Sequence, residues 1–430
     1  MTSSPQEAIE AAVRQRAKDI SLQMGSDEGL PKLRALIEDE AARWSLDFRR
    51  GRHEHDLASP EVVVERAFRN LAGYGPLTDL LGDDDVWEVM VNAPDQIFVR
   101  RHSAGSGYHD ESFHDDEHVI RTLTKILDDS STSHRNLDPT QGLQDAQLDD
   151  GSRLHIVHGD LSRGGHVMVN IRRFTGVPFR SLAELVERDM LTAEAARFLV
   201  SCVRSRLSIL VAGSPGSGKT TLLSCCTAEL DPALRVVVAE EVFEADIPLP
   251  NVASMQTRDA RPERPAVDLR RLVAGFLRMA PDVAIVGEVR DREALPLLLT
   301  LSSGVTGYTT IHAGSARQAL TRLRFICQLA ETASQIPMAA LNSLVAESID
   351  VVVHVARGSQ GPRVTEVLAV EDAAGGADAT HFTTTSVFDR RGRDGALTWT
   401  GQVPSRAADA LEAAGHDVRA LLGPASGSRR

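Results

Sequence analysis

The chain has 430 residues and a mass of 46.5 kDa, which exceeds what one hydrophobic core usually supports, so we expect two or three domains. Its 42% hydrophobic and 25% charged residues are typical of a globular protein, and no apolar run is long enough to cross a bilayer. The formal net charge of −13 gives no overall attraction for nucleic acid or an anionic membrane. Nucleic acid is therefore disfavoured as a direct substrate, although a local basic patch is compatible with an acidic total.

The first 60 residues predict a helical N-terminal extension, because Glu, Arg, Lys and Ala are frequent there and apolar positions are scattered. Ser4, Pro5 and Glu7 supply the cap, first-turn and capping-box residues of a helix that begins at this point. The same segment lacks the apolar stretch of an export signal. We therefore expect the protein to remain in the cytoplasm.

Residues 61–175 mix helical and strand-like periodicity and predict a compact α+β domain. Helices with one apolar face alternate with short runs that are bounded by turn residues such as Pro94 and Asp95. The expected helices are 62–73 and 118–129, and the expected strand segments are 86–92, 96–101, 145–157 and 166–174.

After a linker at 176–190, residues 191–370 change to alternating strands and helices, which is the pattern of a parallel sheet covered by helices. Residues 371–430 predict a C-terminal appendage with a small sheet edge, one helix and a disordered end. In the α/β part, the expected strands are 207–213, 235–240, 283–288, 308–313, 350–356 and 363–371, and the expected helices are 220–230, 268–280, 292–303 and 338–349.

The strongest local signal is a glycine-rich segment that follows an apolar strand and opens a helix, and it matches GxxxxGK[ST] in full. Glycines let such a loop close around phosphates, so that backbone N–H groups and the helix N-terminus face the anion. Lys219 supplies a positive charge, and the Thr220 hydroxyl can ligate Mg²⁺. The alternative is a glycine-rich turn that binds nothing, but a full match in this context favours nucleotide binding. The predicted nucleotide-binding residues are Gly213, Ser214, Pro215, Gly216, Ser217, Gly218, Lys219, Thr220 and Thr221.

A bound triphosphate also needs a metal ligand and a group that orients the attacking water, and carboxylates at the ends of neighbouring strands suit both roles. Glu240 and Glu241 follow one predicted strand, and Glu288 ends another. Each acid alone is equally consistent with a solvated charge at the end of a strand. Beside Lys219 they predict a catalytic set in which Thr220 and Glu288 hold Mg²⁺, and the acid that orients the water stays open.

His312 stands at the end of a further predicted strand, in the run Tyr308–Ala313. A lone histidine at such a place is more often a structural hydrogen-bonding group than a catalytic one. The threonines beside it and its position downstream of Glu288 favour the catalytic interpretation, because the end of the next strand can lie near the γ-phosphate. We expect His312 to sense hydrolysis of the terminal phosphate bond.

Four motifs in this order resemble those of the secretion or traffic ATPases, which serve type II and type IV secretion and pilus assembly. The segments are GSPGSGKT, EEVFE, VGEVR and TTIHA, and they correspond to the Walker A motif, Asp box, Walker B motif and His box of that family. In the N-terminal half, GYGPLTDLL, VWEVMVNAPDQIFVRR, LDDGSRL and NIRRF are similar to the CpaF-type branch, which is linked to tight-adherence pili. The resemblance covers roughly residues 60–370.

This resemblance implies a ring, usually a hexamer, in which an N-terminal domain and a RecA-like C-terminal domain hold ATP between them. Arg153 and Arg172 match family arginines that reach the phosphates from the N-terminal domain. A guanidinium suits that role because it stays charged and binds phosphate oxygens with two donors. Without the family pattern, both would pass for ordinary surface arginines. The resemblance also implies Mg²⁺-dependent ATP hydrolysis, peripheral association with the cytoplasmic membrane, and an inner-membrane platform protein as partner.

The sequence departs from the family pattern at several places. Glu241 stands where Asp is more usual, and Val305 stands where many members have a first histidine, so a relay that requires two histidines is in doubt. The tetracysteine zinc motif of some type II assembly ATPases is missing, which favours the CpaF or type IV branch. The four cysteines form no CxxC pair and lie in apolar stretches typical of buried, reduced thiols: Cys202, Cys225, Cys226 and Cys327.

Two other functions are compatible with the motifs. A RecA-like motor that moves DNA in a conjugation system is the main alternative, and the acidic net charge argues against it. A module that uses nucleotide only as a switch is the second, and the complete set of acids and arginines argues against it. The cargo, the ring size, and the choice between assembly and retraction of a pilus are not encoded in these motifs.

Overall fold

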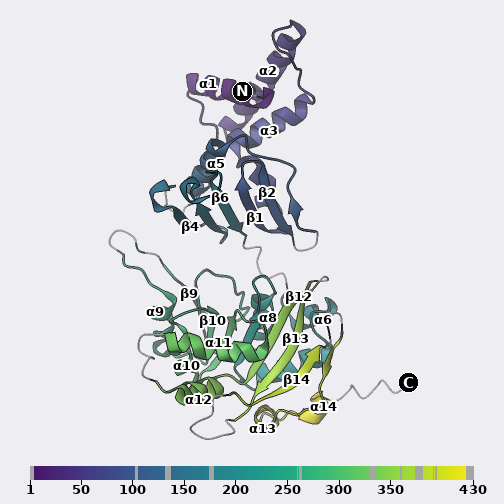
Figure 1. Ribbon diagram of the computed structural model, residues 1–430, viewed down its shortest axis with the longest axis vertical. Coiled ribbons are helices and arrows are strands. Elements are labelled where there is room, and N and C mark those ends of the chain that lie inside the picture. The colour runs from purple at the N-terminus through teal and green to yellow at the C-terminus, as the bar shows by residue number, and fades with distance from the viewer. Residues whose placement is uncertain are drawn as a thin grey trace, which may run out of the picture. The chain divides into compact units, whose positions relative to one another are not determined.

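The chain folds into two compact units, Met1–Thr175 and Gly176–Arg430, each with its own β-sheet (Figure 1). Two predictions from the sequence lie outside the described residues: disorder at the C-terminal end and the start of the linker. No helix in the described part of the chain is long and apolar enough to cross a membrane. The computed structural model describes residues 4–101, 105–130, 137–173, 179–258, 260, 264–329, 336–358, 361–372, 381–390, 392 and 395–422.

Three N-terminal helices pack around a small apolar core of their own: α1 (Pro5–Asp19), α2 (Gly29–Arg49) and α3 (Pro60–Ala72). The predicted capping box is confirmed at the start of α1, where the Ser4 hydroxyl accepts from the Glu7 N–H and the Glu7 carboxylate accepts from the Ser4 N–H. The extension is therefore a packed bundle. Its buried apolar residues are Ile9, Val13, Leu33, Ile37, Ala41, Leu57 and Ala67.

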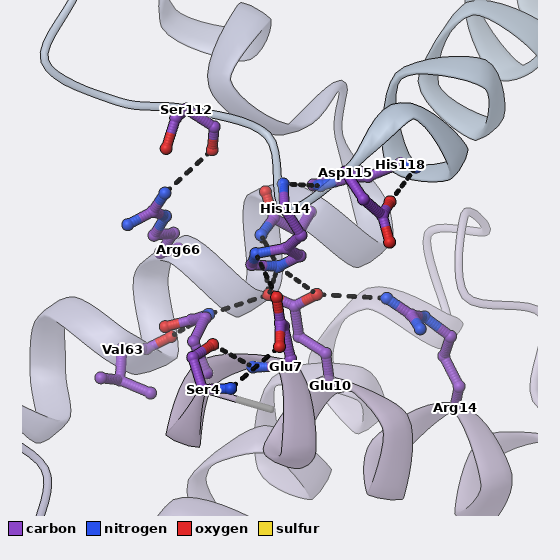
Figure 2. A network of polar contacts seen from close by, with 12 residues as sticks. Ser4, Glu7, Glu10, Arg14, Val63, Arg66, Ser112, His114, Asp115 and His118 are labelled. Carbon is purple, nitrogen blue, oxygen red and sulfur yellow. Dashed lines mark hydrogen bonds and ion pairs between the residues drawn. The ribbon is translucent and has the colours of Figure 1, made fainter. Parts of the chain in front are cut away.

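Glu10 on α1 is the centre of a buried polar network that ties α1 to α3 and to the loop that contains His114 (Figure 2). Its carboxylate accepts hydrogen bonds from Gln6 Nε2 at 2.9 Å, Asn70 Nδ2 at 2.7 Å and Arg14 Nη2 at 3.1 Å. His114 Nε2 lies 3.1 Å from both carboxylate oxygens. Burial alone raises the pKa of a carboxyl, but the hydrogen bonds outweigh it and hold the pKa of Glu10 below its ordinary value. The buried charge is thus well compensated.

The six-stranded sheet of the first unit has the order β3-β2-β1-β6-β5-β4, and its neighbouring strands are antiparallel. Alternate strand residues contribute to an apolar core that also contains the buried face of helix α5 (Asp116–Asp129). The strands are β1 (Val86–Ala93), β2 (Gln96–Arg101), β3 (Gly107–Tyr108), β4 (Leu143–Gln147), β5 (Arg153–Val157) and β6 (Met168–Arg172). Short helical turns are η1 (Gly75–Leu77), α4 (Thr78–Gly82), η2 (Pro139–Gln141) and η3 (Gly159–Leu161).

The nine-stranded sheet of the second unit has the order β15-β14-β13-β12-β7-β11-β10-β8-β9. Neighbouring strands run parallel from β12 through β7, β11, β10 and β8 to β9. Strands β13, β14 and β15 extend the sheet beyond β12 with antiparallel pairing. Every residue of β7 and β8 is buried, which explains the continuous apolar runs in the sequence. The strands are β7 (Ile209–Gly213), β8 (Val236–Glu240), β9 (Val252–Gln256), β10 (Val283–Val289), β11 (Thr306–Ile311), β12 (Val351–Gly358), β13 (Gly361–Val370), β14 (Thr384–Arg390) and β15 (Leu397–Trp399).

Helices cover both faces of this sheet, and Figure 1 shows α10, α11 and α12 grouped on one side of it. The predicted fold class is confirmed: a RecA-like α/β domain with a parallel sheet follows a smaller α+β domain and a helical extension. One face carries α6 (Leu182–Glu187), α7 (Ala193–Arg204), α8 (Lys219–Thr227), α13 (Ser405–Ala413) and α14 (Val418–Leu422). The other face carries α9 (Leu269–Val273), α10 (Ala294–Leu301), α11 (Ala316–Leu329) and α12 (Met338–Ser348).

Two predicted helices are wrong in extent. The helix expected at 268–280 ends as α9 at Val273 and is followed by a 3₁₀ turn, η4 (Phe276–Met279), after which Ala280 has left-handed backbone at φ 50°. The single helix expected in the appendage is two, because Gly415 at φ 87° separates α13 from α14. Strand β9 has no counterpart among the predicted elements, since its residues are half-buried or exposed and give no continuous apolar run.

Candidate nucleotide-binding and hydrolysis site

The glycine-rich loop connects β7 to α8. Gly216 and Gly218 have φ values of 68° and 89°, which residues with side chains rarely adopt, so this loop conformation needs glycine at both places. No side chain in the described part of the chain caps the N-terminus of α8. Its first backbone N–H groups are therefore suited to an anion such as phosphate.

Lys219, the first residue of α8, is buried among polar groups. Its Nζ donates to the Ser214 carbonyl oxygen at 3.1 Å and lies 3.2 Å from Nδ1 of His312. The histidine directly follows β11, which pairs in parallel with β7. Parallel pairing therefore brings together a lysine and a histidine that are 93 positions apart in the sequence.

Glu288, near the end of β10, extends this chain of contacts. Its Oε1 lies 2.7 Å from Nε2 of His312, because β10 and β11 are parallel neighbours. Burial raises the pKa of a carboxyl, but Arg290, His312 and Lys219 outweigh it and hold the pKa of Glu288 below its ordinary value. Burial, and after it the charge of Lys219, lowers the pKa of His312. At neutral pH the pair is thus an ionised carboxylate beside a neutral imidazole.

Both ring nitrogens of His312 lie next to polar groups of the site. A neutral imidazole has one N–H and one acceptor nitrogen. Nδ1 of His312 lies 3.2 Å from both the Lys219 ammonium, which can only donate, and the Gly213 carbonyl oxygen, which can only accept, while Nε2 faces the Glu288 carboxylate. A single ring thus contacts Lys219, the end of β7 and Glu288.

Arg290 joins two of the predicted acids, and the sequence analysis did not single it out. Its guanidinium donates to Glu288 Oε2 at 2.9 Å and to Glu241 Oε2 at 2.7 Å. The signal that could have found it is its place two residues after Glu288 on the same strand end, where an extended backbone returns side chains to one face. The structure thus connects Lys219, His312, Glu288, Arg290 and Glu241 in one line of contacts.

Glu240 has a different environment from the other two acids. It is buried, and its Oε1 accepts hydrogen bonds from the backbone N–H groups of Glu244 at 3.1 Å and Ala245 at 2.9 Å. The carboxylate therefore fixes the segment that follows β8. Glu240 supports the backbone of the predicted Asp box, whereas Glu288 belongs to the contact chain around Lys219.

Thr309 and Thr310, which precede His312, connect β11 to β10 by side-chain hydrogen bonds. Thr309 Oγ1 donates to the Val286 carbonyl oxygen and Thr310 Oγ1 donates to the Gly287 carbonyl oxygen, both at 2.7 Å. These bonds fix the two strand ends next to the contact chain. Val305, which stands in place of the first family histidine, is half-buried and packs against the apolar core on the α10 side.

The predicted metal ligands are compatible with Mg²⁺. Thr220 is the second residue of α8, and the hydroxyl of Thr220 and the carboxylate of Glu288 are oxygen ligands of the kind that Mg²⁺ prefers. Among the described residues, no group of three or more His, Cys, Asp or Glu side chains could hold a metal ion by itself. Such a site suits Mg²⁺, which usually binds through one or two protein oxygens together with substrate phosphates and water.

Arg153 and Arg172 lie directly opposite each other in the sheet of the first unit. Arg153 begins β5, Arg172 ends β6, and the antiparallel register pairs the two residues. Both side chains are half-buried. The structure therefore brings the two predicted arginines together in the first unit, while the phosphate loop belongs to the second. Their meeting at one nucleotide stays a prediction.

The family model described as "Type II/IV secretion system protein" matches residues 70–384. The chain belongs to this family. The matched segment of this type II/IV secretion system protein includes the phosphate loop, the three predicted acids, His312 and both arginines. The family-level resemblance is thereby confirmed, whereas the CpaF-type branch and the roles of individual residues stay predictions.

Similar proteins come from several bacteria. A putative conjugal transfer protein of Mycobacterium tuberculosis is 32% identical over 319 residues, which cover 72% of this chain and 88% of that protein. The type IV secretion system protein PtlH of Bordetella pertussis is 32% identical over 311 residues, which cover 66% of this chain and 89% of PtlH. The solved structure of the Legionella pneumophila ATPase DotB matches 80% of this chain and 83% of DotB, at 14% identity and a TM-score of 0.46.

Proposed function

We propose that this chain hydrolyses ATP with Mg²⁺, and that the reaction drives a type IV or type II secretion machine or the assembly of a pilus. The observation that supports this most strongly is the meeting of Lys219, His312 and Glu288 at the carboxyl ends of three neighbouring parallel strands. Membership of the secretion-system family and similarity to a protein named for type IV secretion support the setting.

The phosphate loop and Lys219 bind the β- and γ-phosphates, and Thr220 and Glu288 hold Mg²⁺. When bound, the ion neutralises charge on the phosphoryl group during transfer. Glu288 is the acid that orients the attacking water, because its ionised carboxylate faces His312. Glu240 is less suited to that role, since its buried carboxylate fixes the backbone of the segment that follows β8.

His312 reports the state of the γ-phosphate. Its ring contacts both the lysine that binds the phosphate and the carboxylate that orients the water. When the phosphate leaves, the anion that Lys219 balanced is lost, and the hydrogen-bond pattern of the ring changes with it. Because only one ring links the two groups, this role does not need the first family histidine that Val305 replaces.

Arg153 and Arg172 bind the phosphates from the first unit and stabilise charge on the transferring group. Their direct pairing across β5 and β6 supports this proposal, because residues opposite each other on neighbouring strands have their side chains on the same face of the sheet. Loss of the γ-phosphate then weakens the grip of both arginines and allows the first unit to move, which converts hydrolysis into displacement.

The working form is a ring of identical subunits, most simply a hexamer, at the cytoplasmic face of the inner membrane. There it acts on a platform protein of the secretion or pilus machine. The absence of any membrane-crossing helix among the described residues fits peripheral association. The geometry of the site supports only nucleotide binding and hydrolysis. The ring and the platform partner are supported by family membership.

The direct test is phosphate release from ATP by the purified full chain, with and without Mg²⁺. Wild-type protein is expected to turn over ATP only with Mg²⁺, and Lys219→Ala is expected to abolish turnover while Lys32→Ala, an exposed lysine in α2, leaves it unchanged. Tight nucleotide binding with no turnover would contradict hydrolysis and favour a nucleotide switch. Equal activity of Lys219→Ala and wild type would contradict the assigned site.

A DNA-transfer motor is the second candidate, and one observation favours it: similar proteins are named for conjugal transfer. The net charge of −13 argues against DNA as the direct substrate. DNA-stimulated ATP hydrolysis that falls steeply with salt concentration would support the motor, because phosphate contacts release counterions. Hydrolysis that is indifferent to DNA at every salt concentration would support protein secretion or pilus assembly.

A further inference from the structure

Strand β12 lies beside β7 and extends past its end. The two strands are parallel, and their register pairs Val355 with Gly213, the last residue of β7. Residues 356–358 of β12 therefore run alongside the phosphate loop, where β7 has already ended. The predicted residues of the nucleotide site do not include any residue of this strand.

Arg357 reaches the phosphate loop from this extension. Its Nη1 donates to the Gly216 carbonyl oxygen at 3.2 Å. Pro362 faces Arg357 across the β12–β13 hairpin, and a Cβ placed on Gly218 would lie 3.1 Å from Pro362 Cβ. The hairpin thus supports the outside of the loop at the two glycines that have positive φ. A loop held in this way is organised before phosphate binds, which lowers the cost of binding.

His354, three residues earlier on β12, reaches the segment that follows β11. Burial lowers the pKa of His354, and a hydrogen bond with the Ala313 backbone opposes that change. Nδ1 of His354 lies 2.6 Å from Oγ1 of Thr365 on the neighbouring strand β13, and His354 itself pairs with Ala212 of β7. Thr365 thereby holds the ring next to the segment that follows His312.

Glu366 supports the same segment from the other strand of the hairpin. It pairs with His354 across β12 and β13. Burial, and after it the charge of Asp389, raises the pKa of Glu366, while a hydrogen bond from the Ala316 backbone stabilises its carboxylate. Ala316 is the first residue of α11. The hairpin therefore contacts both the residue after His312 and the start of the helix that follows.

We propose that β12 is a positioning strand for the nucleotide site, with Arg357 orienting the phosphate loop and His354 orienting the segment that carries His312. This inference rests on the proposed ATP hydrolysis and adds two residues to its site. The two residues support different parts of the reaction. Arg357 acts on the loop that binds the phosphates of both substrate and product, whereas His354 acts on a residue that responds to the γ-phosphate.

The two roles predict different kinetic changes in the full-length chain. Arg357→Ala is expected to raise the KM for ATP about tenfold with little change in kcat, because the lost interaction stabilises bound ATP and the transition state equally. His354→Ala is expected to lower kcat about tenfold with little change in KM, because His312 loses its support. His354→Gln, which keeps an N–H donor, should recover part of kcat. Arg363→Ala is the matched control, because Arg363 lies on the same hairpin opposite Ala356, and its kinetics should equal those of wild type.

Binding of inorganic tripolyphosphate, measured by calorimetry, tests the loop without the base or sugar. Arg357→Ala should bind it about tenfold more weakly than wild type, and His354→Ala should bind it normally. If Arg357→Ala does not fold, Arg357→Gln is measured instead with the same expectation. The assignment would be overturned if neither variant changed the kinetics. It would also be overturned if both variants lowered kcat and raised KM to the same extent. A wild-type chain that does not hydrolyse ATP would instead contradict the proposed function itself.

Discussion

The two sheets of this protein use polar residues in opposite ways. In the parallel sheet of the second unit, β7 and β8 are buried along their whole length, and the chemically active groups stand at or beyond strand ends. In the antiparallel sheet of the first unit, buried residues alternate with half-buried or exposed ones, and Arg153 at the start of β5 pairs with Arg172 at the end of β6. A parallel sheet therefore brings the carboxyl ends of several strands together, whereas an antiparallel pair brings the start of one strand beside the end of the other.

A second contrast concerns buried charge. Glu10 in the first unit and Lys219 in the second are both buried charged groups with a histidine beside them (Figure 2 shows the first). Glu10 receives side-chain donors from several elements and holds a helical bundle together. Lys219 stands at an uncapped helix N-terminus beside a glycine loop. A buried charge alone therefore does not identify an active site; its access to an anion does.

The largest effect that this contrast predicts is on Lys219. Lys219→Ala should reduce the rate of ATP hydrolysis about 1000-fold or more, because it removes the charge that balances the phosphates. Steady-state phosphate release at saturating ATP measures this. A loss of less than about tenfold would show that the strand-end network is not the reaction centre.

The next largest effect concerns the acids at the ends of β10 and β8. Glu288→Gln should lower kcat by roughly 100- to 1000-fold, because an amide cannot act as the carboxylate that orients water. Glu241→Gln is the matched comparison and should cost less, since the Glu241 carboxylate is exposed and pairs with Arg290. If Glu241→Gln were the more damaging change, the assignment of the water-orienting acid would be reversed.

A smaller effect is expected from the face of the antiparallel sheet. Arg153→Ala and Arg172→Ala should each lower kcat about 100-fold, because each removes a donor to the transferring phosphoryl group. Arg163→Ala, an exposed arginine between β5 and β6, is the control. Thermal melting should show that all three variants fold. Normal hydrolysis by the first two variants would mean that the chemistry is confined to the second unit.

The pH dependence of kcat should show a modest change on the acid side. The pKa of His312 is lowered, so its neutral form persists below the ordinary histidine value of 6.5 and is lost only as pH falls further. Glu288, whose pKa is also lowered, stays ionised over the same range. The acid limb of the rate profile should therefore have its midpoint below pH 6.5. A midpoint above that value would contradict the neutral imidazole between Lys219 and Glu288.

The smallest expected effect on catalysis comes from the network in Figure 2. Glu10→Gln should reduce the free energy of unfolding by about 1–3 kcal/mol, because several donors lose a charged acceptor, while hydrolysis stays close to wild type. The folded-state pKa of Glu10 is lowered, so its contribution to stability is present above the ordinary glutamate pKa and is lost as pH falls through the lowered value. Urea unfolding of both chains at several pH values checks this.

The parallel sheet and its phosphate loop could be predicted from sequence, because both leave local signals. A buried strand gives a continuous apolar run, and a phosphate loop needs glycines at fixed spacing before a helix. The register of the antiparallel sheet left only weak signals. The pairing of Arg153 with Arg172 depends on how two distant strands align, and no local spacing encodes that alignment.

The residues that sequence analysis missed share one physical feature. Arg290, His354 and Arg357 each act through a contact with a residue far away in the sequence or through the backbone. A backbone carbonyl oxygen accepts hydrogen bonds from many types of side chain, so such a contact leaves no motif in the sequence. Likewise, the apolar stripe of 268–280 does not report that α9 ends at Val273 or that the 3₁₀ turn η4 follows it.

The most direct test of the account is a structure of the assembled protein with a slowly hydrolysed ATP analogue and Mg²⁺. We expect the triphosphate in the loop between β7 and α8, with Lys219 on its phosphates and the guanidinium groups of Arg153 and Arg172 within hydrogen-bond distance of phosphate oxygens. A triphosphate bound in that loop while both arginines lie far from it in every subunit would contradict the central claim.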